Sequence, residues 1–214
     1  MAREDSEPKA GAIVGDTSNA LGARLRELRV QSGLSVSALA RRLDISVSAV
    51  SQIETGAMTP SVNRLLAIVT TLGVSLAAAF ERPATSGNPA LVTPPLPRGE
   101  YRLARSGTVD PIHLDGGIVY RRLSPGPIDG LELFESTYPP NSAGSRHGDL
   151  GGHEGFEVGS VSSGTLRIQF DDETVELGAG DSITFASTRP HRLSNRSDVP
   201  CVAVWMIVHS VTSA

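Results

Sequence analysis

Two segments of the sequence, residues 147–164 and 180–195, contain side chains whose types and spacing suit the binding of a metal ion or a polar ligand. His153 and Glu157 lie four residues apart in the first segment, and His191 lies in the second. Side chains at an even offset along a strand share one face, so His153 and Glu157 are predicted to point into one cavity. A histidine from a neighbouring strand completes a two-histidine, one-carboxylate set. Such a set leaves open coordination positions and suits iron(II), with manganese, nickel and zinc as alternatives.

The residues leave two interpretations of this site open. The same three side chains also suit a metal-free pocket, in which they hydrogen-bond a small-molecule effector directly. His147, six residues before His153, is a candidate for a further ligand, but a histidine in a glycine-rich loop is more often exposed to solvent. The sequence therefore predicts a metal or effector pocket without deciding between the two.

The elements that must position these side chains are short β-strands. From about Ile118 onward, runs rich in β-branched residues are separated by Gly, Asp, Ser and Pro. In one of them Leu166, Ile168 and Phe170 alternate with polar residues, and two aspartates that follow supply a hairpin turn. Roughly a hundred residues of evenly spaced short strands are typical of a small barrel or sandwich.

The two segments resemble the two sequence motifs of the cupin superfamily, and the resemblance covers residues 101–211. His153, Glu157 and Gly164 match the first motif, and the second is matched by His191 and Asn195. The chain departs from the usual His, Pro and Gly of these motifs at Gly151, Ala186 and Thr188. The resemblance implies an all-β cupin domain, a small double-stranded β-helix barrel, which binds a small molecule with or without a divalent metal.

Residues 21–80 are predicted to form an all-α domain of five short helices. Leu21, Leu25 and Leu28 recur at helical spacing, and Ser35 is placed to cap the second helix. None of the helices is long enough to be stable alone, so they must pack on one another.

Residues 36–55 have the pattern of two short helices that cross steeply at a tight turn. A small residue, Ala40, stands where the two backbones approach, and Ile45 is placed under the turn. Val50 and Ile53 are predicted to bury the inner face of the second helix, which leaves its polar face outward.

This pattern resembles the phage-repressor (Xre/Cro-type) helix-turn-helix family from Leu21 to Phe80, including the segments SVSAVSQIETG and TPS. Asp44 takes the turn position where glycine is usual, and Asp tolerates left-handed backbone better than most residues. The resemblance implies binding to a double-stranded DNA operator through the third helix. The residues that it assigns to the DNA interface are Ser35, Ser46, Val47, Ser48, Ser51, Gln52 and Thr55.

The same resemblance assigns Arg29 and Glu54 to an ion pair that braces the recognition helix, with an ordinary surface bridge of little energy as the alternative. Arg41 and Arg42 either contact phosphate or are solvated surface charges. A helical bundle that has lost DNA binding and serves only assembly is the alternative for the whole domain.

Composition and charge favour a division into a disordered leader (1–18), a DNA-binding domain (19–82), a proline-rich linker (83–100) and a cupin domain (101–214). Residues 19–82 carry seven basic and four acidic groups, a net of +3, whereas residues 83–214 carry ten and fifteen, a net of −5. Only residues 19–82, with their net positive charge, are expected to be attracted to polyanions such as DNA. A single cysteine and the absence of any apolar run of about 18 residues predict a cytoplasmic protein without a membrane span.

Two functions from different classes fit these patterns. The expected one is a non-enzymatic transcriptional regulator that binds an operator as a homodimer and a small-molecule effector in its barrel. The alternative is a mononuclear non-haem iron oxygenase, because the arrangement also resembles the iron epoxidase that acts on hydroxypropylphosphonate. In that case His153, Glu157 and His191 hold the iron. The polar recognition segment favours the regulator.

Overall fold

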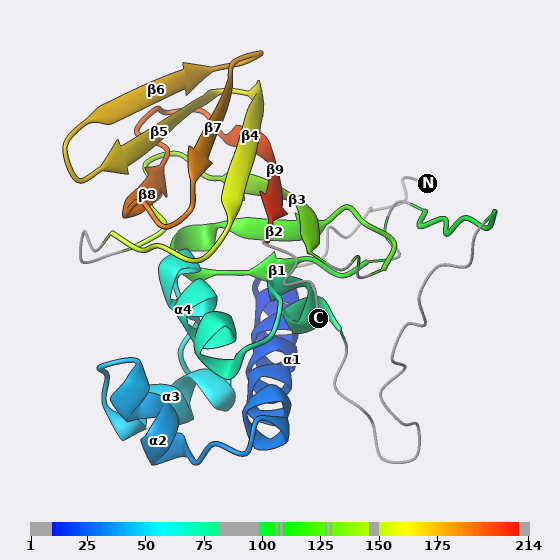
Figure 1. The fold of residues 1–214 in the computed structure, drawn as a ribbon, viewed down its shortest axis with the longest axis vertical. Coiled ribbons are helices and arrows are strands. Elements are labelled where there is room, and N and C mark those ends of the chain that lie inside the picture. Colours follow the sequence, from blue (N-terminus) through cyan, green and yellow to red (C-terminus); the bar gives the residue numbers. More distant parts are fainter. Residues whose placement is uncertain are drawn as a thin grey trace, which may run out of the picture.

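A computed structural model describes residues 10–81, 99–105, 107, 109–126, 128, 130–145 and 150–209. A helical bundle lies directly beneath a β-barrel (Figure 1). The first helix begins at Ala10, inside the segment predicted to be a disordered leader, so the helical region extends further upstream than predicted. Residues 10–20 contain one charged residue, Asp16, and a helix once formed extends at little cost. Most of the predicted linker lies outside the described residues.

The helical domain contains four α-helices and one 3-10 helix, so the prediction of five α-helices was wrong at the last one. That element holds only five residues between Ser75 and Glu81, too few for stable i to i+4 bonding. Serine side chains cap the N-termini of the second, third and fourth helices. Ser35, Ser46 and Ser61 each accept a hydrogen bond from the backbone N–H of the residue three positions later. The helices are α1 (Ala10–Gln31), α2 (Val36–Arg42), α3 (Val47–Glu54), α4 (Val62–Leu72) and η1 (Leu76–Phe80).

The turn between α2 and α3 has the predicted geometry. Asp44 adopts a left-handed φ of 51°, which carboxamide and carboxylate residues tolerate better than most. Ile45 N–H then bonds the carbonyl of Ala40 at 3.0 Å, and Ala40 is buried where the two helices meet. Val50 and Ile53 are also buried, so the inner face of α3 is held by the core.

The C-terminal domain consists of two antiparallel sheets, one with the order β1-β2-β3-β9-β4-β7 and one with the order β6-β5-β8. Strand β3 alternates between buried and partly exposed residues along its whole length, which is the pattern of a strand with one face on a core. The strands are β1 (Ile112–His113), β2 (Val119–Arg122), β3 (Leu131–Tyr138), β4 (Phe156–Ser163), β5 (Thr165–Phe170), β6 (Thr174–Gly178), β7 (Ser182–Ala186), β8 (His191–Ser194) and β9 (Cys201–Val208), with a short 3-10 helix η2 (Asp115–Gly117) before β2.

Trp205 in β9 packs its ring over Gly159, its partner in β4. A Cβ atom at residue 159 would lie 2.3 Å from Trp205 Cζ3, so only glycine fits beneath the indole. We expect Gly159→Ala to lower the free energy of unfolding by about 1–3 kcal/mol through overpacking, measured by urea denaturation. The control is Gly178→Ala, where the nearest atom to an added Cβ is 3.7 Å away and little change is expected. Equal effects in both variants would contradict this account.

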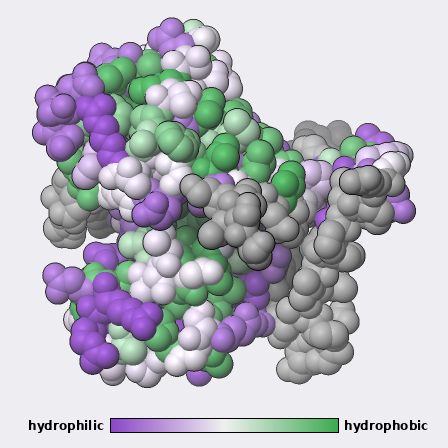
Figure 2. Space-filling view, in the orientation of Figure 1, coloured by the Kyte–Doolittle hydropathy of each residue, from purple (hydrophilic) through white to green (hydrophobic). Residues whose placement is uncertain are grey.

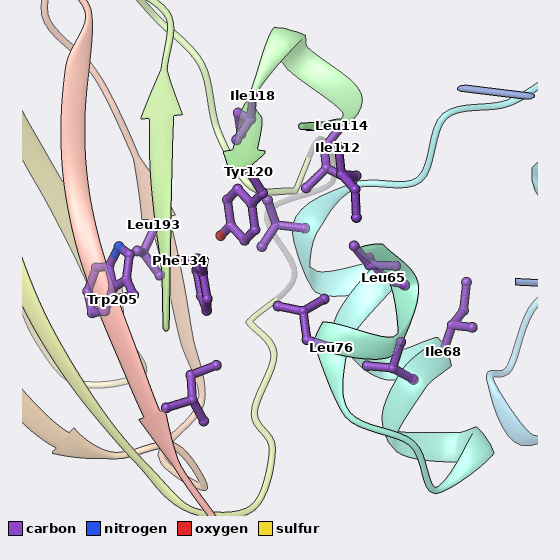
Figure 3. Packing of buried hydrophobic residues seen from close by; sticks show 14 of the residues in the cluster. Leu65, Ile68, Leu76, Ile112, Leu114, Ile118, Tyr120, Phe134, Leu193 and Trp205 are labelled. Atoms are coloured by element: carbon purple, nitrogen blue, oxygen red, sulfur yellow. The ribbon is translucent and has the colours of Figure 1, made fainter. Parts of the chain in front are cut away.

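The two domains share one hydrophobic core. Leu65 and Leu76 from the helical domain lie beside Ile112 and Leu114 from the barrel (Figure 3), and all four belong to one cluster of buried residues. Backbone hydrogen bonds also cross the boundary, from Asn63 N–H to the carbonyl of Gly144 at 3.3 Å and from Asp115 N–H to the carbonyl of Pro60 at 3.0 Å. The helical domain is therefore packed against the barrel as well as joined to it through the chain.

Candidate metal or effector site and DNA-binding surface

The three residues predicted to form the barrel site are brought together. Glu157 lies in β4, His191 begins β8, and His153 precedes β4. Gly151 and His191 exchange two backbone hydrogen bonds of 3.0 and 2.8 Å, and His153 N–H bonds the carbonyl of Ser187 at 3.0 Å. These bonds tie the two ligand-bearing segments side by side. One ligand atom from each of His153, Glu157 and His191 lies within 4.8 Å of the others, and all three residues are buried.

Backbone carbonyls orient both imidazole rings. His153 Nδ1 lies 3.1 Å from the carbonyl oxygen of Glu154, and His191 Nδ1 lies 2.8 Å from that of Arg189. Since a carbonyl can only accept, each Nδ1 is the donor in this contact, and each Nε2 is directed toward the site. This second layer of bonds is the arrangement that fixes metal-ligating histidines.

Glu157 Oε1 stands between the two rings, 2.9 Å from His153 Nε2 and 3.1 Å from His191 Nε2. Burial acts to raise the pKa of Glu157, but the neighbouring His153 and His191 rings outweigh it and lower the pKa to about 2. Burial acts to lower the pKa of His153, and the Glu157 carboxylate reverses this, so the net shift is upward. The site therefore holds a carboxylate anion between two nitrogen donors.

The donor set fits a small divalent cation. Although His153 Nε2 and Glu157 Oε1 are close, neither atom has a partner in hydrogen-bond geometry within the part of the chain that the structure describes. Both atoms are buried without a hydrogen bond, which is costly, and a cation held between them would interact favourably with both. Nitrogen and carboxylate donors in a set of three suit iron, manganese, nickel or zinc.

Aromatic rings enclose one side of the site. The Phe185 ring meets His191 edge to face, with centroids 4.9 Å apart, and packs in turn against Phe170 at 5.2 Å. On the opposite strands Tyr120 and Tyr138 are buried with their hydroxyl groups 3.1 Å apart. Burial raises the pKa of Tyr138 well above its usual range, so both phenols stay neutral. An apolar wall of this kind excludes water and strengthens electrostatic interactions at the site.

Other predicted and unpredicted residues complete the description of this end of the barrel. His147, the candidate fourth ligand, lies outside the described residues. His209 and Glu132 were not predicted as site residues, yet His209 Nε2 lies 3.2 Å from the buried Glu132 Oε1. They are 77 positions apart in the chain, so no sequence spacing pointed to the pair.

The residues predicted to contact DNA all lie on the exposed surface of the helical domain, where hydrophilic side chains gather over α2 and α3 (Figure 2). Gln52 Nε2 donates to Ser48 Oγ at 3.0 Å, one helical turn away, so these two side chains stand side by side. That they contact DNA stays a prediction. The exposed residues are Ser35, Ser46, Val47, Ser48, Ser51, Gln52 and Thr55.

Arg29 and Glu54 form the bracing pair, and the pair is buried. Arg29 Nε and Nη2 donate to the two carboxylate oxygens of Glu54 at 2.6 and 3.0 Å, and Nη1 donates to the carbonyl of Leu34 at 2.7 Å. The two side chains are only 9% and 7% exposed. Hydrogen bonding to Glu54 raises the pKa of Arg29. The bidentate bridge fixes the end of α3 to α1, which excludes the alternative of a loose surface bridge.

Comparison with known proteins agrees with both halves of this architecture. Residues 20–80 match a family model described as a helix-turn-helix domain, and residues 134–207 match a cupin domain. The HTH-type transcriptional regulator PuuR of Escherichia coli (strain K12) is 28% identical over 187 residues, which cover 87% of this chain and 93% of the relative. The solved structure of an HTH_3-family transcriptional regulator from Vibrio cholerae is 23% identical with a TM-score of 0.64, and the match covers 92% of this chain and 98% of that one.

Hydroxypropylphosphonic acid epoxidase from S. wedmorenis also matches, at 19% identity with a TM-score of 0.43, over 89% of this chain and 97% of that one. A score of this size supports no argument about function. The chain therefore combines a helix-turn-helix domain over residues 20–80 with a cupin domain over residues 134–207. PuuR, which the chain matches over 87% of its length, is a transcriptional regulator. No helix among the described residues is long and apolar enough to cross a membrane.

Proposed function

We propose that this protein is a sequence-specific DNA-binding transcriptional regulator, and not an enzyme, whose cupin barrel binds a small-molecule effector. The observation that carries the proposal is that α3 is held rigidly with a polar face exposed to solvent. Its outer face is exposed and polar, with Ser48, Ser51 and Gln52, while its inner face is buried and its end is clamped by the Arg29–Glu54 bridge. Repressor-type domains present such a helix to the major groove.

The protein binds its operator in the cytoplasm as a homodimer. Two copies related by a two-fold axis present two recognition helices, so the operator has two half-sites about one helical turn (roughly 34–36 Å) apart. The net charge of +3 on residues 19–82 assists the approach to DNA, and the net charge of −5 on residues 83–214 keeps the barrel away from it.

The effector occupies the barrel beside His153, Glu157 and His191, which would hold an iron, manganese, nickel or zinc ion. Such an ion, when bound, offers open coordination positions to oxygen or nitrogen atoms of the effector. The backbone carbonyls of Glu154 and Arg189 hold the two rings in place, and Phe185 limits the access of water. Because the helical domain packs on the barrel, effector binding can favour one domain arrangement and thereby change DNA affinity.

The test is selection of genomic DNA fragments by the purified full-length protein at near-physiological salt, followed by sequencing. We expect a recurrent motif with two-fold symmetry, since a two-fold dimer recognises two copies of one half-site. Binding that is blind to sequence and disappears as salt is raised would contradict the proposal, because it is the behaviour of a generic phosphate contact.

Gln52→Ala is expected to weaken operator binding by about 1–3 kcal/mol, or roughly 5- to 150-fold, if the amide bonds an adenine bidentately. The measurement is a fluorescence titration of the selected operator and of a variant operator with each A·T pair changed in turn. The matched control is Gln169→Ala, since Gln169 lies in β5 of the barrel and bonds Arg192. An equal loss on every operator variant would show that Gln52 does not read a base.

An iron-dependent oxygenase or epoxidase is the second candidate function. The observation that favours it is the set of three buried ligands with one carboxylate, which leaves open positions on iron. The chain has a single lysine, Lys9, so arginine would have to bind a phosphonate substrate. Oxygen uptake by the iron-loaded protein with 2-hydroxypropylphosphonate tests this candidate, and we expect none above the rate of free iron.

A further inference from the structure

Arg189 lies in the turn between β7 and β8, two residues before His191. Its backbone N–H donates to the carbonyl of Ala186 at 3.0 Å, which closes the turn. Its own carbonyl oxygen lies 2.8 Å from His191 Nδ1 and is the acceptor that orients this ring. The direction of the ring therefore depends on where the turn is held.

The side chain of Arg189 ties this turn to the hairpin between β5 and β6. Its Nη2 atom donates to Asp172 and, at 2.9 Å, to Glu173, and its Nε atom lies 3.9 Å from a carboxylate oxygen of Asp171. The three acidic side chains are exposed, whereas that of Arg189 is only 34% exposed. A single exposed ion pair contributes little, but one guanidinium shared by three acidic residues of one hairpin forms a network that restricts the turn.

A stack of aromatic rings joins the same side chain to His191 by a second route. The Arg189 guanidinium lies over the Phe170 ring, with Cζ 4.0 Å from the ring centroid. Phe170 meets Phe185 edge to face at 5.2 Å, and Phe185 meets the His191 ring in the same way at 4.9 Å. Because Phe170 and Phe185 are buried, Arg189 closes the outer end of a stack whose inner end is the histidine of the site.

We infer that Arg189 is a positioning residue of the metal or effector site, which holds the His191 ring with Nε2 toward Glu157 Oε1, 3.1 Å away. The inference rests on the proposed function, since it concerns the site in which we propose that a metal or effector binds. A ring that turned away from the Arg189 carbonyl would carry Nε2 out of reach of Glu157. His153 differs, since its Nδ1 atom contacts the carbonyl of the adjacent residue, Glu154. The hairpin on the outside of the barrel therefore acts on one of the two histidines of the site.

The test compares the full-length protein with Arg189→Met, which retains an aliphatic stem over Phe170 and removes the charge. The metal-free proteins are examined by NMR, through nuclear Overhauser contacts between the ring protons of His191 and Phe185. We expect these contacts in the unmodified protein, because the two rings meet edge to face. In the variant the turn is released, so the contacts should be largely lost, while those between Phe185 and Trp205 stay unchanged.

A zinc titration against a chelating indicator gives a second readout. Arg189→Met should weaken zinc binding about tenfold, the lower end of the range for residues that orient a metal ligand. Arg189→Lys keeps a positive charge beside the hairpin and should restore most of the affinity. The matched control is Arg167→Met, because the ion pair of Arg167 with Glu176 joins β5 to β6 and leaves the turn untouched. We expect this control to bind zinc as the unmodified protein does.

A second variant changes the hairpin and leaves the turn itself intact, which guards against a folding defect in Arg189→Met. Asp172→Asn with Glu173→Gln removes the charges of the two hydrogen-bond acceptors of Arg189 and should have the same effects. Combined with Arg189→Met it should add nothing, since both changes break one contact. Additive losses, or unchanged ring contacts in Arg189→Met, would overturn the inference. The NMR measurement needs neither metal nor DNA, so failure of the operator selection would count against the proposed function alone.

Discussion

Replacing Glu54 by alanine is expected to lower the free energy of unfolding of the helical domain by about 3–5 kcal/mol, because the change leaves the Arg29 guanidinium buried without its carboxylate. Arg29 retains a single bond, to the carbonyl of Leu34, for a fork that now makes three. The end of α3 also loses its tie to α1, so operator affinity should fall together with stability. The measurement is urea denaturation followed by circular dichroism at 222 nm.

Two further variants separate the buried pair from a surface bridge. Glu135→Ala removes the partner of Arg121 in an exposed pair, whose side chains are 28% and 44% exposed, and should cost no more than about 1 kcal/mol. The double variant Arg29→Met with Glu54→Leu removes both buried charges and should recover most of the lost stability, since well-packed hydrophobic residues often replace a buried pair without loss. A small effect of Glu54→Ala, equal to that of the exposed pair, would mean that burial of the bridge contributes nothing.

Replacing Glu157 by alanine is expected to weaken divalent metal binding by at least about 100-fold, because even the loss of a partner of a ligand weakens metal affinity 10- to 100-fold. The carboxylate supplies the only negative charge among the three ligands and stands between both histidine nitrogens. The measurement is a titration with zinc and with manganese against a chelating indicator, and with iron(II) under anaerobic conditions.

Glu157→Gln tests whether charge or shape decides this affinity, since the amide retains an oxygen of similar position. It should fall close to the alanine variant if the ionised carboxylate binds the metal. Glu176→Gln is the control, because Glu176 is 63% exposed on β6 of the same barrel. If Glu157→Ala and Glu157→Gln bind metal as the unmodified protein does, the metal does not bind at this site. The metal-free interpretation of the pocket then holds, and His153, Glu157 and His191 bond the effector directly.

Local patterns in the sequence predicted the elements and most of the candidate residues. The steep crossing at Ala40, the buried positions at Val50 and Ile53, and the outward polar face of α3 follow from the helical period, which relates residues three and four apart. The meeting of His153 with Glu157 was predicted from an even offset along one strand, but His153 precedes β4 and is held beside Glu157 by its backbone bond to Ser187. Such relations involve neighbours in the chain, so they could be read without knowledge of the fold.

The sequence-based prediction was wrong about the ends of two helices. The fifth helix is a short 3-10 helix because only five residues separate Ser75 from Glu81. The first helix extends back to Ala10, since its upstream residues continue a helix that packing has already formed. Ends of elements depend on caps and contacts more than on period, and they are the least determined part of a sequence pattern.

The sequence by itself determined the two kinds of domain, the face that α3 turns outward and the residue types of the barrel site. Only the tertiary structure decided that Arg29 and Glu54 are buried, and that Glu132, Leu76 and His209 meet at the boundary between the domains. Glu132 is separated from Leu76 by 56 positions and from His209 by 77, and contacts over such separations leave no periodic pattern in the sequence. They arise when the apolar faces of α4 and the barrel are buried against each other, and that burial also determines which polar atoms are left without water.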